Sequence, residues 1–196
     1  MPYADQNEIL LQYALENHKN FEVAIGLAYL RDEMRKRVIS ESLVRLTGVL
    51  QKEFGEGWEL ENGGSREPLA RWWVLSARKV MWDPRFSIAL CPENNGARGF
   101  IIGVRGNPGY SYPNQTPIKL EPEPENAQTV KRTLDEKYRP ASQSEWWAWY
   151  HFLDGEYRDW DNASVLVQIY SGISIEKIST QFRRIREVAE PVLDVL

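Results

Sequence analysis

The spacing of apolar residues changes at Gly55-Glu56-Gly57, and this change constrains the fold more than any other feature of the chain. Before these glycines, apolar residues recur every three or four positions, which is the period of a helix with one buried face. After them, apolar and polar residues alternate, which is the period of a strand with one buried face. The sequence therefore predicts helices followed by strands, in an α+β fold.

The helical part has two predicted segments. Asp5 and Glu8 have the spacing of a capping box, and the helix that they open is predicted to end near His18-Lys19-Asn20, which places the first histidine at a helix C-terminus. A second stretch with helical periodicity runs from Phe21 to Phe54. Ser40 is a candidate N-cap inside it, so the stretch is either one long helix or two.

An antiparallel meander of about four strands is predicted between Trp58 and Val104. Its clearest part is a β-hairpin over residues 85–106, because alternating apolar residues flank the turn sequence Asn95-Gly96. A strand over residues 72–82, rich in aromatic and β-branched residues, precedes this hairpin.

The second half of the chain returns to mixed elements. Prolines interrupt residues 107–126, so this segment is predicted to be a loop. The elements beyond it are predicted in this order: a helix over residues 127–138, a strand over residues 146–153, a second apolar β-type run over residues 165–170, and a closing helix over residues 174–189 that Pro191 breaks or kinks.

We interpret residues 1–196 as a single α+β domain. Its central antiparallel meander is expected to contain about four to six strands, with the C-terminal helix packed on the sheet. Its parts are a helical region (1–55), the β-meander (57–106), a proline-rich acidic loop (107–126), and a region of helix, strands and C-terminal helix (127–196).

The composition agrees with a folded, cytoplasmic protein. With 42% hydrophobic residues and eight tryptophans, the chain needs no disulfide or metal to form a core. Cys91 is the single cysteine, which fits a reducing compartment. The first residues lack the features of a secretory signal, and the apolar runs are too short to span a bilayer. We therefore expect a cytoplasmic location, the host cytoplasm for a phage-encoded protein, and no membrane partner.

The sequence contains no recognisable catalytic constellation. His18, His151 and Cys91 lack neighbours at metal-ligand spacing, and the glycines follow neither of the phosphate-binding patterns. A Gly-x-Ser-x-Gly nucleophile elbow is also missing. We therefore predict no catalytic residue, no cofactor and no metal, and we favour a non-enzymatic role. The net charge of −4 does not favour broad attraction to nucleic acid.

The acidic run Glu121-Pro122-Glu123-Pro124-Glu125 is the first candidate for partner binding. Alternating prolines favour an extended polyproline course that holds the carboxylates in water. The run is either a solvated surface loop or an acidic arm that engages a basic partner. In the second case Glu121, Glu123 and Glu125 are the binding residues.

The aromatic set Trp146, Trp147, Trp149 and Tyr150 is the second candidate. In a regular strand, Trp147 and Trp149 share one face, and Trp146 and Tyr150 share the other. One face is expected to pack on the core. The other meets a helix, a ligand or a protein partner, because large exposed apolar patches mark interaction sites.

Four motifs then occur in a suggestive order: Gly55-Glu56-Gly57-Trp58, Phe100-Ile101-Ile102-Gly103-Val104, Tyr157-Arg158-Asp159-Trp160, and Val165-Leu166-Val167-Gln168-Ile169 before the final helix. This order resembles the C-terminal accessory region of some PD-(D/E)XK nuclease-family proteins of bacteria and phages, over residues 30–196. That family's chemistry needs carboxylates on adjacent strands around a divalent metal. Here the matching triplet, Asp135-Glu136-Lys137, falls on a predicted helix. The resemblance therefore implies an accessory domain shape and a place in phage–host conflict, without the catalytic motif.

Three functional hypotheses remain. The first is a non-enzymatic protein-binding module, in its concrete form a phage or mobile-element inhibitor of a nucleic-acid-targeting defence complex, similar to an anti-CRISPR protein. The second is a degenerate or metal-dependent nuclease of the PD-(D/E)XK type. The third is a nucleic-acid-binding accessory domain that combines exposed tryptophans with the following arginines: Arg31, Arg35, Arg37, Arg183, Arg184 and Arg186. The sequence leaves the partner and the oligomeric state open.

Overall fold

The computed structural model describes residues 2–63, 71, 73–106, 125–144 and 146–195, with side chains from Asn7 onward and, after the long gap, from Ala127. The chain divides into two compact units, Met1–Arg37 and Val38–Leu196. The second contains the sheet and the core, and the first is built from helices alone.

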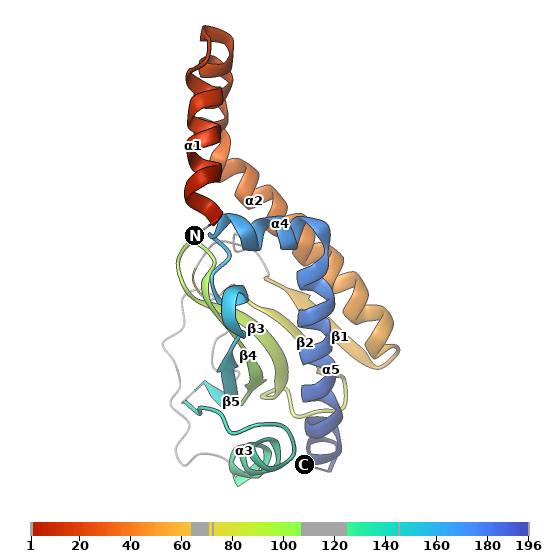
Figure 1. Cartoon of the computed structure of the whole chain (residues 1–196). Helices are drawn as coiled ribbons and strands as arrows, with labels where there is room; N and C mark the ends of the chain where they lie inside the picture. Colours follow the sequence, from red (N-terminus) through yellow and green to blue (C-terminus); the bar gives the residue numbers. More distant parts are fainter. Residues whose placement is uncertain (1, 64–70, 72, 107–124, 145, 196) are drawn as a thin grey trace. The chain divides into compact units, whose positions relative to one another are not determined.

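The first unit is a helical hairpin (Figure 1). It contains α1 (Pro2–Leu15) and the beginning of α2 (His18–Phe54). The side chain of Asn17 accepts a hydrogen bond from the backbone N–H of Asn20 at 2.9 Å, as an N-cap does. Two sequence predictions are therefore wrong: the first helix starts before Asp5 and ends at Leu15, and the first histidine begins a helix instead of ending one.

Helix α2 is a single helix, which decides between the two alternatives left by the sequence. Ser40 lies inside it and caps nothing. From Ile39 onward its buried residues are spaced at helical intervals, ending at Phe54. Gly55 follows with a positive φ of 77°, the left-handed conformation in which helices commonly end.

The described strands form one five-stranded antiparallel sheet in the order β1-β2-β3-β4-β5, as the meander prediction requires. The strands are β1 (Trp58–Asn62), β2 (Leu75–Lys79), β3 (Ser87–Asn94), β4 (Arg98–Arg105) and β5 (Trp147–Phe152). The predicted hairpin is confirmed as β3 and β4, with Gly96 and Ala97 at positive φ in the turn. Strand β2 is shorter than the predicted 72–82.

One face of the sheet carries the main core (Figure 1). Helices α3 (Glu125–Lys137) and α5 (Ile173–Leu193) and the second half of α2 pack on this face. Phe100 and Ile102 of β4 and Phe182 of α5 belong to this core, and all three side chains are fully buried. The structure thus confirms the α+β fold with its C-terminal helix on the sheet.

Residues 165–170 form a helix, α4 (Ala163–Ser171), and the β-type prediction for them is wrong. Asn162 caps this helix by accepting from the N–H of Ser164 at 2.9 Å. At its other end, Arg45 of α2 donates to the carbonyls of Ile169 and Tyr170. These caps satisfy backbone groups at both ends, and they outweigh the strand preference of the β-branched residues.

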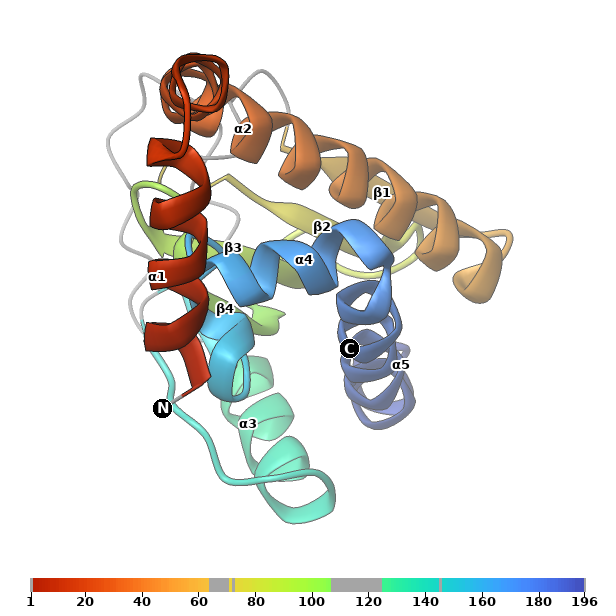
Figure 2. The same ribbon diagram turned by 45° about the horizontal axis from the view of Figure 1, so that its top comes forward.

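Helix α5 follows α4 after a turn at Gly172, whose φ is 85° (Figure 2). Helical periodicity predicts a buried stripe in this helix, formed by Ile175, Ile178, Phe182, Ile185 and Val188 or Ala189. Of these, Ile178, Phe182, Ile185 and Ala189 are buried. Pro191 lies inside the helix and does not break it, because the helix continues to Leu193. The η1 turn (Gly155–Arg158) precedes both helices and links them to β5.

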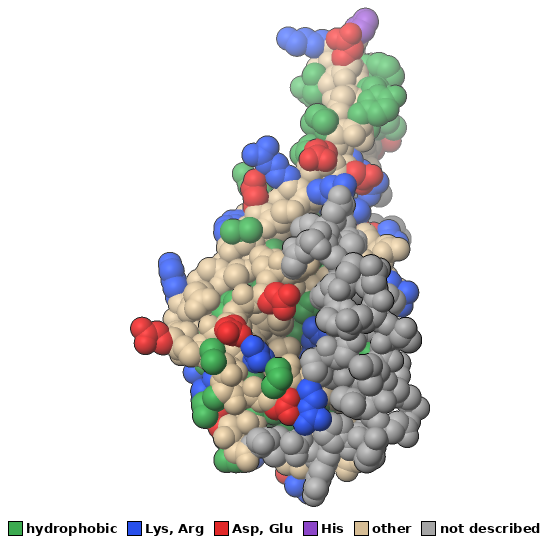
Figure 3. Space-filling model, turned by 180° about the vertical axis from the view of Figure 1, so that it is seen from behind, with side chains coloured by type: hydrophobic (Ala, Val, Ile, Leu, Met, Phe, Trp, Pro, Cys, Tyr) green, Lys and Arg blue, Asp and Glu red, His purple; other side chains and the backbone are tan. Residues whose placement is uncertain are grey.

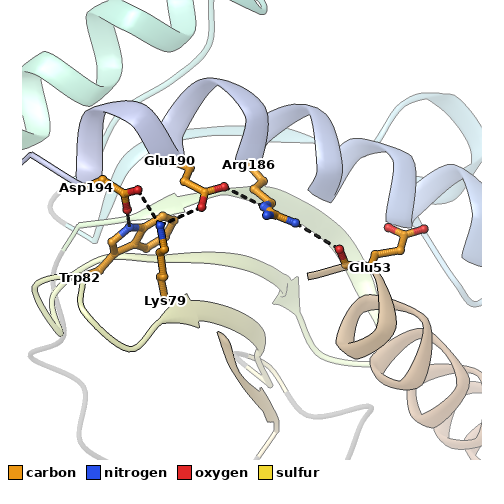
Figure 4. A network of polar contacts seen from close by, with 6 residues as sticks. All are labelled: Glu53, Lys79, Trp82, Arg186, Glu190 and Asp194. Carbon is orange, nitrogen blue, oxygen red and sulfur yellow. Dashed lines mark hydrogen bonds and ion pairs between the residues drawn. The ribbon is translucent and has the colours of Figure 1, made fainter. Parts of the chain in front are cut away.

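A chain of polar contacts joins β2 to the end of α5 (Figure 4). Lys79 bonds Asp194 at 2.5 Å and Glu190 at 2.9 Å, and the indole of Trp82 donates to Asp194 at 2.7 Å. Burial alone raises the pKa of Glu190, but hydrogen bonds from Arg186 and Lys79 bring it below its usual value. Arg186 also donates to the Glu53 carbonyl, which extends the network to α2.

The pairing of β4 with β5 leaves no room for a side chain at Gly103. A Cβ atom added there lies 2.1 Å from the carbonyl oxygen of Trp149 and 2.7 Å from the Cα of Tyr150. Both are backbone atoms, so neither can turn aside. The two strands must therefore separate to admit any side chain at this position.

We predict that Gly103→Ala lowers the free energy of unfolding by about 3 kcal/mol or more, because the clash is with backbone. Gly48→Ala is the matched control. Gly48 lies inside α2 with open space around it, so the same change there is expected to stabilise the protein by about 0.5–1 kcal/mol. Urea denaturation of both variants measures the two effects. Equal, small effects of the two changes would contradict the close approach of the strands.

Candidate functional site

The aromatic residues of β5 do not share faces as the sequence predicts, because the pairing with β4 contains a bulge. Arg105 pairs with Trp147 and Val104 with Trp149, so Ala148 is an extra residue. Trp149 enters the main core, and Trp147 lies in a second cluster on the other face of the sheet. The prediction that the two indoles share a face is therefore wrong.

The second cluster contains Val74, Ala89, Cys91, Ile101 and Trp147. Cys91 is buried in it, as expected of a small core residue. Half-buried Trp146 and Tyr150 pack against the same cluster. Of the four predicted aromatic binding residues, only these two therefore retain exposed surface for a partner.

Trp149 is tied to the sequence triplet that resembles the nuclease motif. Its indole donates to Asp135 at 3.1 Å and to the carbonyl of Arg139 at 3.2 Å. Asp135 also accepts from Lys131 at 2.5 Å and from the N–H of Ala141 at 3.0 Å. Burial raises the pKa of Asp135, but the Lys131 hydrogen bond contributes to a net value below the usual one.

Asp135 therefore acts as an anchor between α3, the segment that follows it and β5. It lies on a helix, as predicted for the triplet. Within the described ranges, no group of three or more His, Cys, Asp or Glu side chains is arranged to hold a metal ion.

The second histidine lies on β5 beside a hollow of about 500 Å³. His151 is 6% exposed, and its ring packs against Tyr138 and Trp149. Its Nδ1 lies 2.7 Å from the carbonyl of Phe152, which can only accept, so Nδ1 carries the hydrogen. Nε2 is buried without a partner, and burial lowers the pKa of His151.

The hollow beside His151 has a polar wall. Arg139 pairs with Asp154 at 3.0 Å, and Arg158 lies over the ring of Phe152 at 3.8 Å. Since the Nε2 atom of the histidine is covered by protein, it does not face a molecule in this hollow. The histidine is therefore a buried residue of the sheet, and its unpaired ring nitrogen lies inside the protein.

Two arginines of the nucleic-acid hypothesis form ion pairs with carboxylates of this protein. Arg183 pairs with Glu53 at 3.3 Å. Arg186 bonds Glu190 at 2.8 Å and stacks over the rings of Phe54 and Trp58. Their charge is therefore partly neutralised within the protein.

The acidic run lies largely outside the described residues. Nothing is described of Glu121 or Glu123, and Glu125 is the first residue of α3, described by its backbone alone. The acidic-arm interpretation therefore stays a prediction.

The most unusual surface lies on the helical hairpin, where Figure 3 shows hydrophobic side chains on the helices. None of its described residues up to Arg37 is buried. Large apolar side chains there are between 43% and 85% exposed: Ile9, Leu10, Leu11, Tyr13, Leu15, Phe21, Val23, Ile25, Leu27, Tyr29, Leu30 and Met34. We call this set the hairpin apolar surface.

The least exposed residues of the hairpin are not these large ones. From Asn7 to Met34, the residues of intermediate burial are Ala14, Asn20, Ala24 and Gly26, and the other residues are more exposed. Asn20 also donates to the carbonyl of Tyr13 at 2.9 Å. Small and polar residues are thus the most buried of the hairpin, and the large apolar ones keep much of their surface exposed.

Helical periodicity does not reveal this surface, because apolar residues that recur at helical spacing are normally interpreted as the buried face of a helix. A signal was present in Ile9-Leu10-Leu11, three successive apolar residues that cannot share one face of a helix. A helix that is apolar on all sides needs cover on all sides. Only the stripe that begins at Ile39 is covered within the second unit.

Comparisons with known proteins identify no relative of this chain. No protein-family model, curated protein or solved structure gives a significant match to this chain. No described helix combines the length and the apolar character that a bilayer crossing requires.

We predict that His151 makes stability depend on pH between about 7.5 and 5.5. The pKa of His151 is lowered in the folded protein. Around and below the ordinary value of about 6.5, the unfolded chain therefore binds more protons than the folded protein does, and stability decreases as the pH decreases. The slope from one such group is at most about 1.4 kcal/mol per pH unit. Urea denaturation at both pH values should show a smaller loss for His151→Gln than for the wild type.

His18→Gln is the matched control, because His18 lies exposed at the start of α2. This variant keeps the buried ring, so the pH dependence that His151 contributes should remain in it. An unchanged pH dependence in His151→Gln would show that the buried ring is protonated as easily in the folded protein as in the unfolded chain.

Proposed function

We propose that this chain is a non-enzymatic protein-binding module that docks through the hairpin apolar surface. The observation that carries the proposal is the exposure of twelve large apolar side chains on a helical pair without one described buried residue. Monomeric proteins rarely leave such surface in water unless it serves an interaction.

The energetics of the hairpin support this role. Isolated helices of 14 residues, the length of α1, are marginal in water, and helices in proteins gain most of their stability from packing an apolar face. A half-exposed Leu or Ile side chain gains about 1 kcal/mol when a partner covers it. A docked partner thus supplies the core that the hairpin lacks.

The charge of the hairpin indicates the chemistry of the docking. Between residues 9 and 30, the only Asp, Glu, Lys or Arg side chains are Glu16, Lys19 and Glu22. The complementary surface is therefore apolar and not strongly charged. Binding by such contacts depends little on salt, because screening weakens only charge–charge attraction.

For the external partner, we propose a nucleic-acid-processing complex of a defence system, which would make the chain an inhibitor carried by a phage or mobile element. The support is the acidic run with Glu121, Glu123 and Glu125, in which prolines space the carboxylates. Such a run is suited to a basic channel built for phosphates.

The docking role of the hairpin predicts that Leu27→Ser combined with Leu30→Ser abolishes partner capture by the full chain. Val44→Ser is the matched control. Val44 lies on the same helix, is 65% exposed and is outside the hairpin. Affinity capture from the native cells, followed by mass spectrometry, compares the three proteins, and circular dichroism checks their folding. Equal capture by the double variant and the control would remove the hairpin from the docking role.

The acidic arm makes a separate prediction. Changing Glu121, Glu123 and Glu125 together to Gln removes three charges while keeping the side-chain size. Captured nucleic-acid-processing proteins should then be lost, and the loss should be mimicked in the wild type by raising the salt concentration. If the triple variant retains the same partners, the acidic run is an ordinary solvated segment.

A further inference from the structure

We infer that the hairpin apolar surface binds a second copy of this chain, so that two hairpins pack into a four-helix bundle about a twofold axis. The inference rests on the proposed function, because it names the partner of the same surface.

The positions of the apolar residues on α2 require more than one neighbouring helix. At 3.6 residues per turn, Phe21, Ile25 and Tyr29 lie on one side of the helix. Leu27 and Leu30, with Val23 and Met34, lie on the opposite side. A single partner helix covers only one side, and both sides remain exposed beside α1.

The same argument applies to α1. Ile9, Leu10 and Leu11 point in three different directions around the helix, and all three are more than half exposed. A helix with this pattern is normally surrounded by other helices. A second hairpin brings two helices at once, which is the arrangement of a four-helix bundle.

The area of the surface is the size that a dimer needs. Each such side chain has roughly 100 Å² of apolar surface, and about half of it is exposed. The twelve residues together therefore offer about 600 Å² of exposed apolar surface per copy. A standard interface buries about 800 Å² on each partner, and about 65% of a homodimer interface is apolar. The hairpin apolar surface therefore matches one side of a homodimer interface.

The charge of the surface permits pairing with itself. In a twofold dimer each patch faces its own copy, so a strongly charged patch would repel its counterpart. Residues 9–30 carry Glu16 and Glu22 against Lys19, which leaves one net negative charge. A second copy thus meets apolar surface with little repulsion.

The test is the mass of the full chain in solution, measured by light scattering after size exclusion and by sedimentation on dilution. The wild type should have twice the mass of one 22.8 kDa chain at micromolar concentration. Leu27→Ser with Leu30→Ser should raise the dimer dissociation constant at least about 100-fold. Val44→Ser should remain dimeric. A wild type that stays monomeric at about 50 µM overturns the inference.

Two further readouts separate the possible occupants. Co-sedimentation of a monomeric wild type with vesicles of phosphatidylcholine and phosphatidylglycerol would assign the surface to a lipid interface and overturn the inference. A monomeric wild type whose captured protein is lost in the double hairpin variant would overturn the second copy and keep the proposed function. A monomer whose capture is the same in both hairpin forms would overturn both proposals.

Discussion

The structure depends on one difference along helix α2: a stripe of its apolar residues is buried from Ile39 onward, whereas its large apolar residues up to Met34 are exposed. The buried stripe belongs to the core that holds the sheet, α3 and α5 together. The large apolar side chains from Phe21 to Met34 are 43–85% exposed. Burial of apolar side chains is the main favourable contribution to folding, so these side chains contribute fully only when something covers them. Under the proposed function, a single helix serves folding in one half and recognition in the other.

The sequence predicts well those elements whose signal is local. The turn at Asn95-Gly96 and the stripe of α5 depend on neighbouring residues alone, and both are observed. It fails where a distant contact decides. Residues 165–170 look like a strand, yet Asn162 and Arg45 cap them as a helix. The apolar pattern of the hairpin was visible in the sequence, but periodicity shows that a stripe exists and does not show what covers it.

The tryptophan cluster illustrates the same limit in the candidate site. A strand taken alone places Trp147 and Trp149 on one face, but the bulge opposite Val104 and Arg105 inserts a residue between them. Register is a property of two strands, so one strand's sequence does not reveal it. The bulge therefore leaves less aromatic surface exposed, because Trp149 lies in the core and donates a hydrogen bond to Asp135. Asp135 in turn stabilises the fold where the resemblance to nucleases had placed a motif residue.

The distribution of charge is consistent with the proposed recognition through apolar contacts. Lys79, Glu190 and Asp194 are joined in one network, and Arg186 extends it to α2. Charges held in such pairs contribute less to long-range attraction, since the paired groups cancel each other's field. The hairpin has few charged residues over its apolar stretch. The proposed docking there would gain its specificity from shape and from the positions of apolar side chains around two helices, which favours a partner that is itself a pair of helices.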